Sequence, residues 1–560
     1  MKSPWIAMAL IAVTIAAGTA PAVEPDILYE TTLSTEYYIP QASDIVVDDA
    51  GNAYLLATAY ENHHSLDVIV IKLDHLGNEA WTYYYAHAGH SYATGIALDS
   101  NGHPWVTGWT DDSDFPLVNP IDSQFDTREM FVMKFDPVDG GILYSTFIGG
   151  DYTDTGEAIV INDQDEIIIG GTSGSTDFPT TPDAWQSEPS APLYIFQDAV
   201  IVKLSPSGDQ ILYASYFGGF EDDWIDSIDL DGQGNLIVGG HTNSDDFPLN
   251  GAIETAPDDI FISKLSADGQ DLLFSTYFGG SDLDRLGQLV SDDAGNVCLA
   301  GITRSVDLPT TAGTFSPDFV GEINGCEVPF GGHYNCEDFF AFRLSTSGDG
   351  IAWGTYLGGE TVDMARGIAC DWLGNVFVAG YTSSADFPLY DGSFGAAFVV
   401  CKLTGDGSTL EYTHFVNSGS ANRGNGIFVD GENDIYFTGT VGVPASIFVS
   451  KLQGDRATAV DDPRTMAPAS IALAPSFPNP FNPRTTITFS LARNERVLVE
   501  VYEPAGKRVA VLANRTFAAG EHSLIWNGRN AAGRPMPSGT YFVRLGVASE
   551  MQSQKLMLVR

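Results

Sequence analysis

Polar residues recur at one position of a repeated sequence pattern through most of the chain, and their side-chain oxygens could bind a cation or a sugar. This position lies at a fixed distance ahead of a repeated Gly-Asn turn and holds Asp154, Asp223, Asp284, Asp363 and Asn422, with Ser91 and Pro40 in two further copies. Gathered at one opening, four carboxylates and an amide would offer hard oxygen ligands to Ca²⁺. Asp also bonds readily to nearby backbone, so a residue that recurs once per repeat is typical of a turn cap. The pattern favours the turn cap and leaves both interpretations open.

The familiar catalytic motifs are absent from the sequence. It contains no HExxH, no GxSxG and no phosphate-binding Walker motif. Asp and Glu number 73, so a carboxylate pair for glycoside cleavage is an open alternative, although abundance alone does not make a pair. The sequence therefore predicts no catalytic residue and no certain cofactor. Ca²⁺ is the one candidate cofactor, and its ligands are unassigned.

The five cysteines divide into two groups. Cys326 and Cys336 flank a Gly-rich loop, GCEVPFGGHYNC, and we expect them to form a local disulfide if the protein is exported. A metal site there would need more ligands than His333 supplies. The other three, Cys298, Cys370 and Cys401, fall inside strand patterns, where a thiol usually behaves as a small buried hydrophobe.

The elements that must position these residues are the strands of a long repeat. One clear copy runs from Phe261 to Pro309, and each copy holds four short strand patterns bounded by turn residues. The third pattern carries a basic residue just before its last apolar residue seven times: Lys72, Lys134, Lys203, Lys264, Arg343, Lys402 and Lys451. A fourth-strand pattern at 27–33 opens the array, and a third-strand pattern at 447–452 ends it. This arrangement predicts a seven-bladed β-propeller over 27–453 whose N-terminal strand completes the last blade and removes the exposed edges.

Two motifs give the repeat a family likeness. Asp-Phe-Pro recurs at 114–116, 177–179, 246–248 and 386–388, and L-x-Y-S-T-x-x-GG recurs in the fourth strand. We expect Phe to pack between blades, Pro to end the strand and Asp to cap the turn. With these motifs the chain resembles SBBP-repeat proteins over roughly 27–453. That resemblance implies the propeller fold and assigns no activity.

A second module follows a linker at 454–474, which is rich in Ala, Pro and charge. Alternating apolar residues split by Gly-containing turns predict a small β-sandwich over 475–560. It resembles the FlgD-like immunoglobulin domain and the type A sorting domain of the type IX secretion system. The resemblance implies recognition by outer-membrane secretion machinery, and an accessory sandwich without a sorting role is the alternative. The residues that carry it are Pro478, Asn479, Pro480, Phe481, Asn482, Pro483, Trp526, Gly528, Ser538, Gly539 and Tyr541.

The N-terminus and the charge bear on location and partners. Residues 1–22 combine Lys2, a short apolar run and small residues up to Ala22, which predicts a cleaved signal peptide and no transmembrane segment. The net charge is −47, yet 476–560 carries 11 Lys and Arg against 5 Asp and Glu. The acidic part should repel nucleic acid.

These observations define three hypotheses for function. We expect an exported or cell-surface, non-enzymatic propeller that binds a glycan or protein ligand. The alternatives are a propeller hydrolase or lyase acting on polysaccharide, and a structural surface protein with a cation-stabilised propeller.

Overall fold

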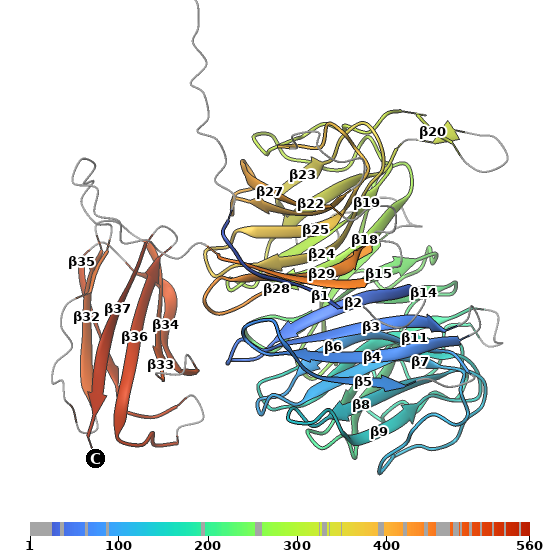
Figure 1. Ribbon diagram of the computed structural model, residues 1–560, viewed down its shortest axis with the longest axis horizontal. Coiled ribbons are helices and arrows are strands. Elements are labelled where there is room, and N and C mark those ends of the chain that lie inside the picture. The colour runs from blue at the N-terminus through green and yellow to red at the C-terminus, as the bar shows by residue number, and fades with distance from the viewer. Residues whose placement is uncertain are drawn as a thin grey trace, which may run out of the picture.

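Figure 1 shows the protein as a computed structural model made of strands and loops. The structure describes residues 25–33, 39–61, 65–85, 89–191, 196–251, 260–323, 325–327, 333–334, 336–348, 350–389, 397–417, 423–441, 446–454, 471–473, 481, 484–491, 495–503, 507–517, 520–530, 534–547 and 550–559. These residues contain no helix, so none of them forms a helix long and apolar enough to span a membrane. The predicted signal peptide and most of the predicted linker lie outside the described residues.

The first four sheets each hold four antiparallel strands that are consecutive in the chain. Blade 1 consists of β2 (Ile39–Val47), β3 (Ala53–Glu61), β4 (Ser65–Leu73) and β5 (Glu79–Tyr85), and blade 2 of β6 (Ser91–Leu98), β7 (Pro104–Thr110), β8 (Glu129–Phe135) and β9 (Ile142–Ile148). Blade 3 consists of β10 (Asp154–Ile161), β11 (Ile167–Ser173), β12 (Asp198–Leu204) and β13 (Ile211–Phe217), and blade 4 of β14 (Asp223–Leu230), β15 (Leu236–Thr242), β16 (Ile260–Leu265) and β17 (Leu272–Phe278).

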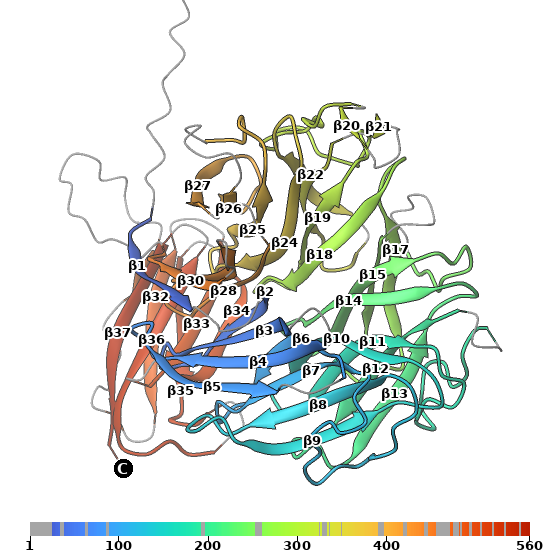
Figure 2. The ribbon, with the colours of Figure 1, turned by 45° about the vertical axis from the view of Figure 1, so that its right-hand side comes forward.

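Three further sheets complete the ring shown in Figure 2. Blade 5 consists of β18 (Asp284–Ser291), β19 (Val297–Thr303), β22 (Asp338–Leu344) and β23 (Ile351–Leu357), and blade 6 of β24 (Asp363–Cys370), β25 (Val376–Thr382), β26 (Ala397–Leu403) and β27 (Leu410–Asn417). Blade 7 consists of β28 (Arg423–Val429), β29 (Ile435–Val441), β30 (Ser446–Leu452) and, from the other end of the chain, β1 (Ile27–Leu33). The innermost strands β2, β6, β10, β14, β18, β24 and β28 each pack against the next, and β28 packs against β2.

Two sets of contacts close the ring. β1 pairs antiparallel with β30, so that Leu33 lies opposite Ile447. On the inner side, the Thr440 hydroxyl donates to the carbonyl of Pro40 at 3.1 Å and accepts the backbone N–H of Ala42 at 3.3 Å. The all-β fold class, with a propeller closed by the N-terminal strand, is thereby confirmed.

In blades 2 to 5 and in blade 7, the repeated basic residue forms an ion pair with an acid of the repeated turn. In blade 4, Lys264 Nζ lies 2.7 Å from Asp231 Oδ2, and both side chains are buried. The other Asp231 oxygen accepts the backbone N–H of Asn235 at 3.0 Å, while Gly234 adopts a φ of +82° that a side chain would strain. The turn is therefore a capped hairpin, and Lys264 takes part in a structural ion pair beside it.

The Phe of each Asp-Phe-Pro motif packs where two blades meet. Phe247, from blade 4, lies 5.3 Å between ring centroids from Phe217 of blade 3 and 4.4 Å from Phe261 of its own blade. The motif's Asp caps a loop, since Asp246 Oδ1 accepts the N–H of Phe220 at 2.8 Å. The same contact recurs at Asp177 and Asp386, and at Asp307 of the Asp-Leu-Pro variant at 307–309. This motif builds the scaffold.

The C-terminal strands form two facing sheets (Figure 1). One contains β31 (Ile471–Leu473), β32 (Thr485–Leu491) and β35 (Gly520–Trp526); the other contains β33 (Glu495–Tyr502), β34 (Arg508–Phe517), β36 (Gly539–Val547) and β37 (Glu550–Leu558). Trp526 lies at their centre, 5.3 Å from Phe481 and 5.0 Å from Tyr541 between ring centroids. The predicted small β-sandwich is present.

Candidate ligand site in the propeller channel

The recurring Asp residues sit at the start of the innermost strands and face inward into the protein. Asp223 is fully buried, and its Oδ2 accepts the N–H of Gly219 at 2.7 Å and the hydroxyl of Ser244 at 3.0 Å. Asp154, Asp284 and Asp363 repeat both bonds and are at most 1 % exposed. These contacts are those of the turn cap, and a ligand in the channel would not reach the carboxylates. Asn422 lies outside the described residues.

Three of these Asp residues meet a second buried acid from the preceding blade. Asp198 faces Asp223, Asp338 faces Asp363, and Glu129 faces Asp154. Burial raises the pKa of Asp338 to about 7, and the charge of Asp363 adds to the effect. Burial likewise raises the pKa of Asp363 to about 7. Such pairs hold a proton at neutral pH.

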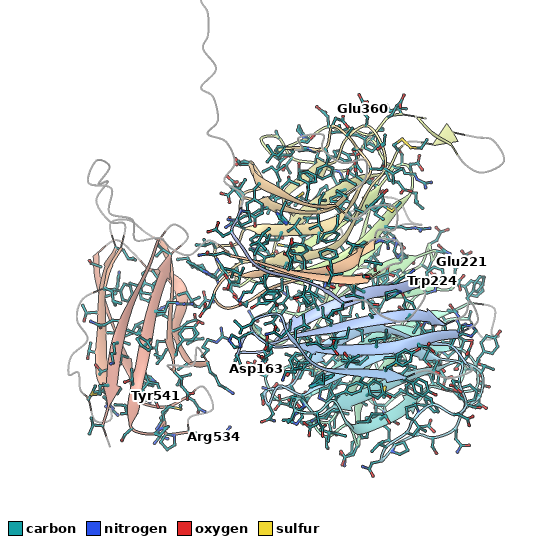
Figure 3. The ribbon with its side chains drawn as sticks, in the orientation of Figure 1. Asp163, Glu221, Trp224, Glu360, Arg534 and Tyr541 are labelled. Carbon is teal, nitrogen blue, oxygen red and sulfur yellow. A yellow bond between two sulfur atoms is a disulfide. The ribbon has the colours of Figure 1, made fainter. Side chains whose placement is uncertain are left out.

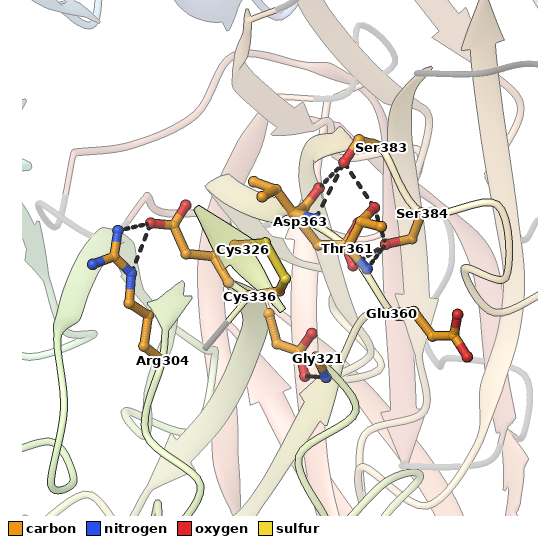
Figure 4. Close-up of a disulfide and its surroundings, with 12 residues drawn as sticks. Arg304, Gly321, Cys326, Cys336, Glu360, Thr361, Asp363, Ser383 and Ser384 are labelled. Atoms are coloured by element: carbon orange, nitrogen blue, oxygen red, sulfur yellow. Dashed lines mark hydrogen bonds and ion pairs between the residues drawn. A yellow bond between two sulfur atoms is a disulfide. The ribbon is translucent and has the colours of Figure 1, made fainter. Parts of the chain in front are cut away.

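The disulfide expected from the sequence is present between Cys326 and Cys336 (Figure 4). Cys326 lies in β20 (Cys326–Glu327), which pairs with β21 (His333–Tyr334), and Cys336 follows β21 in the loop between β19 and β22. Nearby, Arg304 Nη2 donates to Glu337 Oε1 at 2.5 Å. Among the described residues, no three His, Cys, Asp or Glu side chains gather as a metal site.

A feature that we did not predict opens a different site. Every innermost strand carries a β-bulge at the same place in its pairing with the second strand. A bulge leaves one residue outside the ladder and re-aims its side chain. We call the seven extra residues the bulge ring: Ser43, Thr94, Glu157, Asp226, Gly287, Arg366 and Asn425.

The bulge ring lines a cavity of about 290 Å³ inside the propeller. The wall is formed by Ser43, Thr94, Glu157, Asp226, Gly287 and Arg366 of the ring, together with Asp44, Tyr92 and Gln288. Figure 3 labels Trp224 at the start of β14 and Asp163 just beyond the end of β10, and these mark the two faces between which the inner strands run. The ring residue differs in every blade.

The charges on this wall are unevenly distributed. Burial raises the pKa of Glu157 to about 8; the Asp226 charge raises it further, while a hydrogen bond from Thr155 and the Arg128 charge oppose that rise. Asp226 forms an ion pair with Nδ1 of His241. Burial also raises the pKa of Asp44 to about 7, opposed by backbone N–H groups of Ile45 and Ile96. Carboxyl groups with such different surroundings within one cavity are typical of functional sites.

Aromatic rings stand near these acids. Tyr92 lines the cavity and stacks on Trp109, with 6.0 Å between ring centroids and an interplanar angle of 17°. The Arg128 guanidinium lies over the Trp109 ring at 4.1 Å from its centroid. The Tyr92 ring therefore adds an aromatic surface to the polar wall of the cavity, as in many small-molecule sites.

One signal in the sequence could have located the bulge ring. Each bulged residue stands two positions before the Ile or Leu of the first-strand pattern, as in Thr94-Gly95-Ile96 and Arg366-Gly367-Ile368. This apolar residue is constant in type across the copies, whereas the residue two positions before it differs in each copy. The bulge itself stays hidden because it is a property of the pairing of two strands.

Of the residues proposed for sorting, Phe481, Trp526 and Tyr541 belong to the sandwich core, whereas Ser538 and Gly539 are exposed. Phe481 is 2 % exposed and exchanges backbone hydrogen bonds with Met557 and Val559. The Tyr541 hydroxyl donates to the Pro537 carbonyl at 2.9 Å, and Gly528 accepts the N–H of Met536 while adopting a φ of +68°. Ser538 and Gly539 lead into β36. Pro478, Asn479, Pro480, Asn482 and Pro483 lie outside the described residues.

Comparisons with known families agree with both parts of the chain. The model of the FlgD Ig-like domain matches residues 481–550, and that of the SBBP β-propeller repeat matches residues 352–388. The chain contains both kinds of unit. No curated protein matches the sequence.

Several solved structures are distantly similar. A fungal alcohol oxidase of the AA5 family, in complex with copper, is 11 % identical with a TM-score of 0.44, covering 96 % of this chain and 100 % of its own. A gluconolactonase from Xanthomonas campestris is 12 % identical with a TM-score of 0.31, covering 79 % and 99 %. A protein of unknown function from Dyadobacter fermentans is 11 % identical with a TM-score of 0.38, covering 78 % and 100 %. At these TM-scores the neighbours carry no argument about activity.

Proposed function

We propose that this protein is an exported propeller that binds a small polar molecule in the cavity lined by the bulge ring. The observation that carries the proposal is the ring itself: one position per blade, re-aimed by a bulge, occupied by different polar residues in almost every copy. A position needed only for packing would resemble its neighbours across the blades. Binding sites are built in this way on rigid repeats, where the scaffold is constant and the ligand-facing residues vary.

The cavity volume supports a small ligand. About 290 Å³ lies at the lower end of the range of roughly 300–1,000 Å³ that ligand pockets occupy. A monomer-sized compound would fill it, whereas a polymer could place only its end there.

The C-terminal sandwich is, in this proposal, the module that delivers the propeller to the outer-membrane secretion machinery and the cell surface. The match to the FlgD Ig-like model over 481–550 supports it, together with the signal peptide expected at 1–22. Deleting 475–560 should leave a folded propeller that accumulates inside the outer membrane. Unchanged release or surface display of the truncated chain would contradict the sorting role.

Binding can be tested on the chain from residue 23 onward. We would titrate it calorimetrically with a panel of monosaccharides, amino acids and dicarboxylates, alongside Glu157→Gln and Asp226→Asn. A channel ligand should lose at least tenfold in affinity in both variants and be unaffected by Glu79→Gln, whose carboxylate is exposed on β5. Binding with the same affinity in both channel variants as in the original chain would refute the proposal.

A second candidate function is hydrolysis of a glycoside. Glu157 and Asp226 lie on neighbouring blades, line one cavity and have different surroundings, which favours an acid and a base in one site. Turnover of small aryl glycosides that disappears in Glu157→Gln would establish it. Binding without turnover would leave the protein a binding module.

A further inference from the structure

Three residues at the junction of blades 5 and 6 depart together from the repeat. Cys298 in β19 lies opposite Arg343 of β22, and Cys370 ends the innermost strand β24. In the other six blades the position of Cys298 holds Tyr54, Trp105, Ile168, Ile237, Phe377 and Tyr436. The position of Cys370 holds Val47, Leu98, Ile161, Leu230, Ser291 and Val429. Arg343 stands where every other blade has Lys.

In the other blades these two positions serve to pack one sheet on the next. Trp105 of blade 2 shares an apolar cluster with Ile161 of blade 3, and Tyr436 of blade 7 shares one with Val47 of blade 1. Close packing between blades therefore favours large apolar side chains here. The junction of blades 5 and 6 instead brings two thiols together, which packing alone does not explain.

The two sulfur atoms lie in contact but differ in access. A hydrogen bond joins the side chains of Cys298 and Cys370, whose strands pack against each other. Cys298 is fully buried. Cys370 is partly exposed and lines a cavity of about 250 Å³. A reagent in that cavity would reach the Cys370 sulfur first, and the Cys298 sulfur lies behind it.

The Arg343 guanidinium is fixed beside the buried sulfur. Its Nε lies 3.3 Å from Cys298 Sγ, and its Nη1 and Nη2 donate to the carbonyls of Gly405 and Gly374 at 2.5 and 2.6 Å. The hydrogen bond from Cys370 lowers the pKa of Cys298; burial opposes this, and the Arg343 charge lowers the pKa again. Because the thiolate is the nucleophile in disulfide chemistry, this setting favours reaction at the pair.

The third cysteine of the strands has none of these features. Cys401 is buried, its Sγ lies 3.8 Å from the Thr413 hydroxyl, and burial raises its pKa to about 12. A thiol in such surroundings is inert. Cys401 is therefore a control within the same chain.

From this arrangement we infer that Cys298, Cys370 and Arg343 form a thiol–disulfide exchange site, whose substrate is a small disulfide. The partly exposed Cys370 would attack the substrate, and Cys298, held beside Arg343, would resolve the product. The site is separate from the proposed channel function, because the described wall of the bulge-ring cavity contains neither sulfur.

The exchange balances in two steps. Cys370 gives its proton to water, its thiolate attacks one sulfur of the substrate, and the substrate S–S bond breaks. The other half of the substrate leaves as a thiolate and takes up a proton. The Cys298 thiolate then attacks Cys370 Sγ, breaks the mixed disulfide and releases the second half as a thiol. The pair loses two electrons and two protons to form a disulfide between blades 5 and 6, and the substrate is reduced to two thiols.

The test uses the folded chain from residue 23 onward, reduced and freed of reductant, with 2-hydroxyethyl disulfide as the probe. Samples are alkylated at intervals, digested, and searched by mass spectrometry for the Cys298–Cys370 linked peptide. We expect this peptide to accumulate without denaturant and to disappear on addition of 2-mercaptoethanol. Cys401 should stay unmodified throughout.

Three variants follow what other blades carry, so each should fold. Cys298→Ile should stop at a stable probe adduct on Cys370, whereas Cys370→Val should form no adduct on the buried Cys298. Arg343→Lys should form the linked peptide about threefold more slowly or worse, because the buried thiolate loses its guanidinium. Equal melting temperatures under reducing conditions would confirm that Arg343→Lys is folded.

Several results would overturn the inference. It is wrong if no linked peptide forms, if the peptide forms only in urea, or if Cys401 reacts as fast as Cys370. It is also wrong if Arg343→Lys reacts at the original rate. A linked peptide that 2-mercaptoethanol reduces only after unfolding would show a structural crosslink instead of an exchange site. None of these results bears on ligand binding in the channel.

Discussion

The buried carboxyl pair at the junction of blades 5 and 6 should make the propeller less stable as the pH rises. Asp338 is fully buried, and its Oδ2 accepts the N–H groups of Val320 at 2.8 Å and Gly321 at 3.0 Å. Its Oδ1 has no hydrogen-bond partner among the described residues. A Cβ on Gly358 would come within 2.5 Å of that oxygen and 3.0 Å of Asp363 Oδ2, so both acids converge on one glycine.

The direction and size of the effect follow from the pKa of Asp338, which burial first and Asp363 second raise to about 7. In the unfolded chain an Asp has a pKa of about 3.9. Between these values only the unfolded chain releases the proton, so the free energy of unfolding falls by about 1.4 kcal/mol per pH unit. The full stability is present below pH 4, and up to about 4 kcal/mol is lost by pH 7 from this group.

Asp338→Asn should remove this dependence. The amide oxygen can still accept the two backbone N–H groups, and its NH₂ can donate to Asp363. We expect the variant to match the original chain near pH 4 and to exceed its free energy of unfolding by roughly 2–4 kcal/mol at pH 8. Urea unfolding followed by Trp fluorescence at pH 4, 6 and 8 would measure the difference.

A matched substitution should behave in the opposite way. Asp268 is exposed, and hydrogen bonds, chiefly from Ser266, lower its pKa. Asp268→Asn should therefore gain no stability at pH 8. If Asp338→Asn is no more stable than the original chain at pH 8, or if its advantage is the same at every pH, the buried-pair reasoning is wrong.

Three other predictions concern closure, the repeated ion pair and the channel. Deleting Ile27–Leu33 removes the partner of β30 and exposes that edge, so the melting temperature should fall markedly; an unchanged value would contradict closure. Lys264→Met leaves the Asp231 carboxylate buried without its cation and should cost about 3–5 kcal/mol in the free energy of unfolding, measured in urea with Lys264→Arg as the retained-charge control; a loss below about 1 kcal/mol would count against the pair. Because burial raises the pKa of Glu157 to about 8, affinity for an ammonium-bearing ligand should increase from pH 7 to pH 9 in titrations, whereas Glu157→Gln should show no such increase.

Much of the fold could be predicted because residues with the same structural role recur in several copies of the repeat. The Asp-Phe-Pro motif predicted that Phe247 packs between blades and that Asp246 caps a loop, and both contacts are present. The orphan strand patterns at the two ends predicted the pairing of β1 with β30. In each case the residue acts on its own blade or the adjacent one, so local sequence carries the information.

The candidate site was harder to predict because it depends on how neighbouring strands pair and on which way their side chains point. Asp223 and its equivalents carry carboxylates that could bind a cation. Their oxygens instead accept hydrogen bonds from the preceding Gly-Gly loop and from the Ser that follows the second strand, such as Gly219 and Ser244 around Asp223. Glu157 and Asp226 attract no attention in the sequence, since they are two acids among 73. Only the bulge, which shifts the register between two strands, brings them to one wall.

The central claim is that a small ligand lies within the bulge ring, and a crystal structure with the best compound from the titration panel tests it most directly. The ligand should occupy the cavity and contact the side chains of Glu157 and Asp226. Density for the ligand only on the outer loops, with the cavity wall untouched, would contradict the claim.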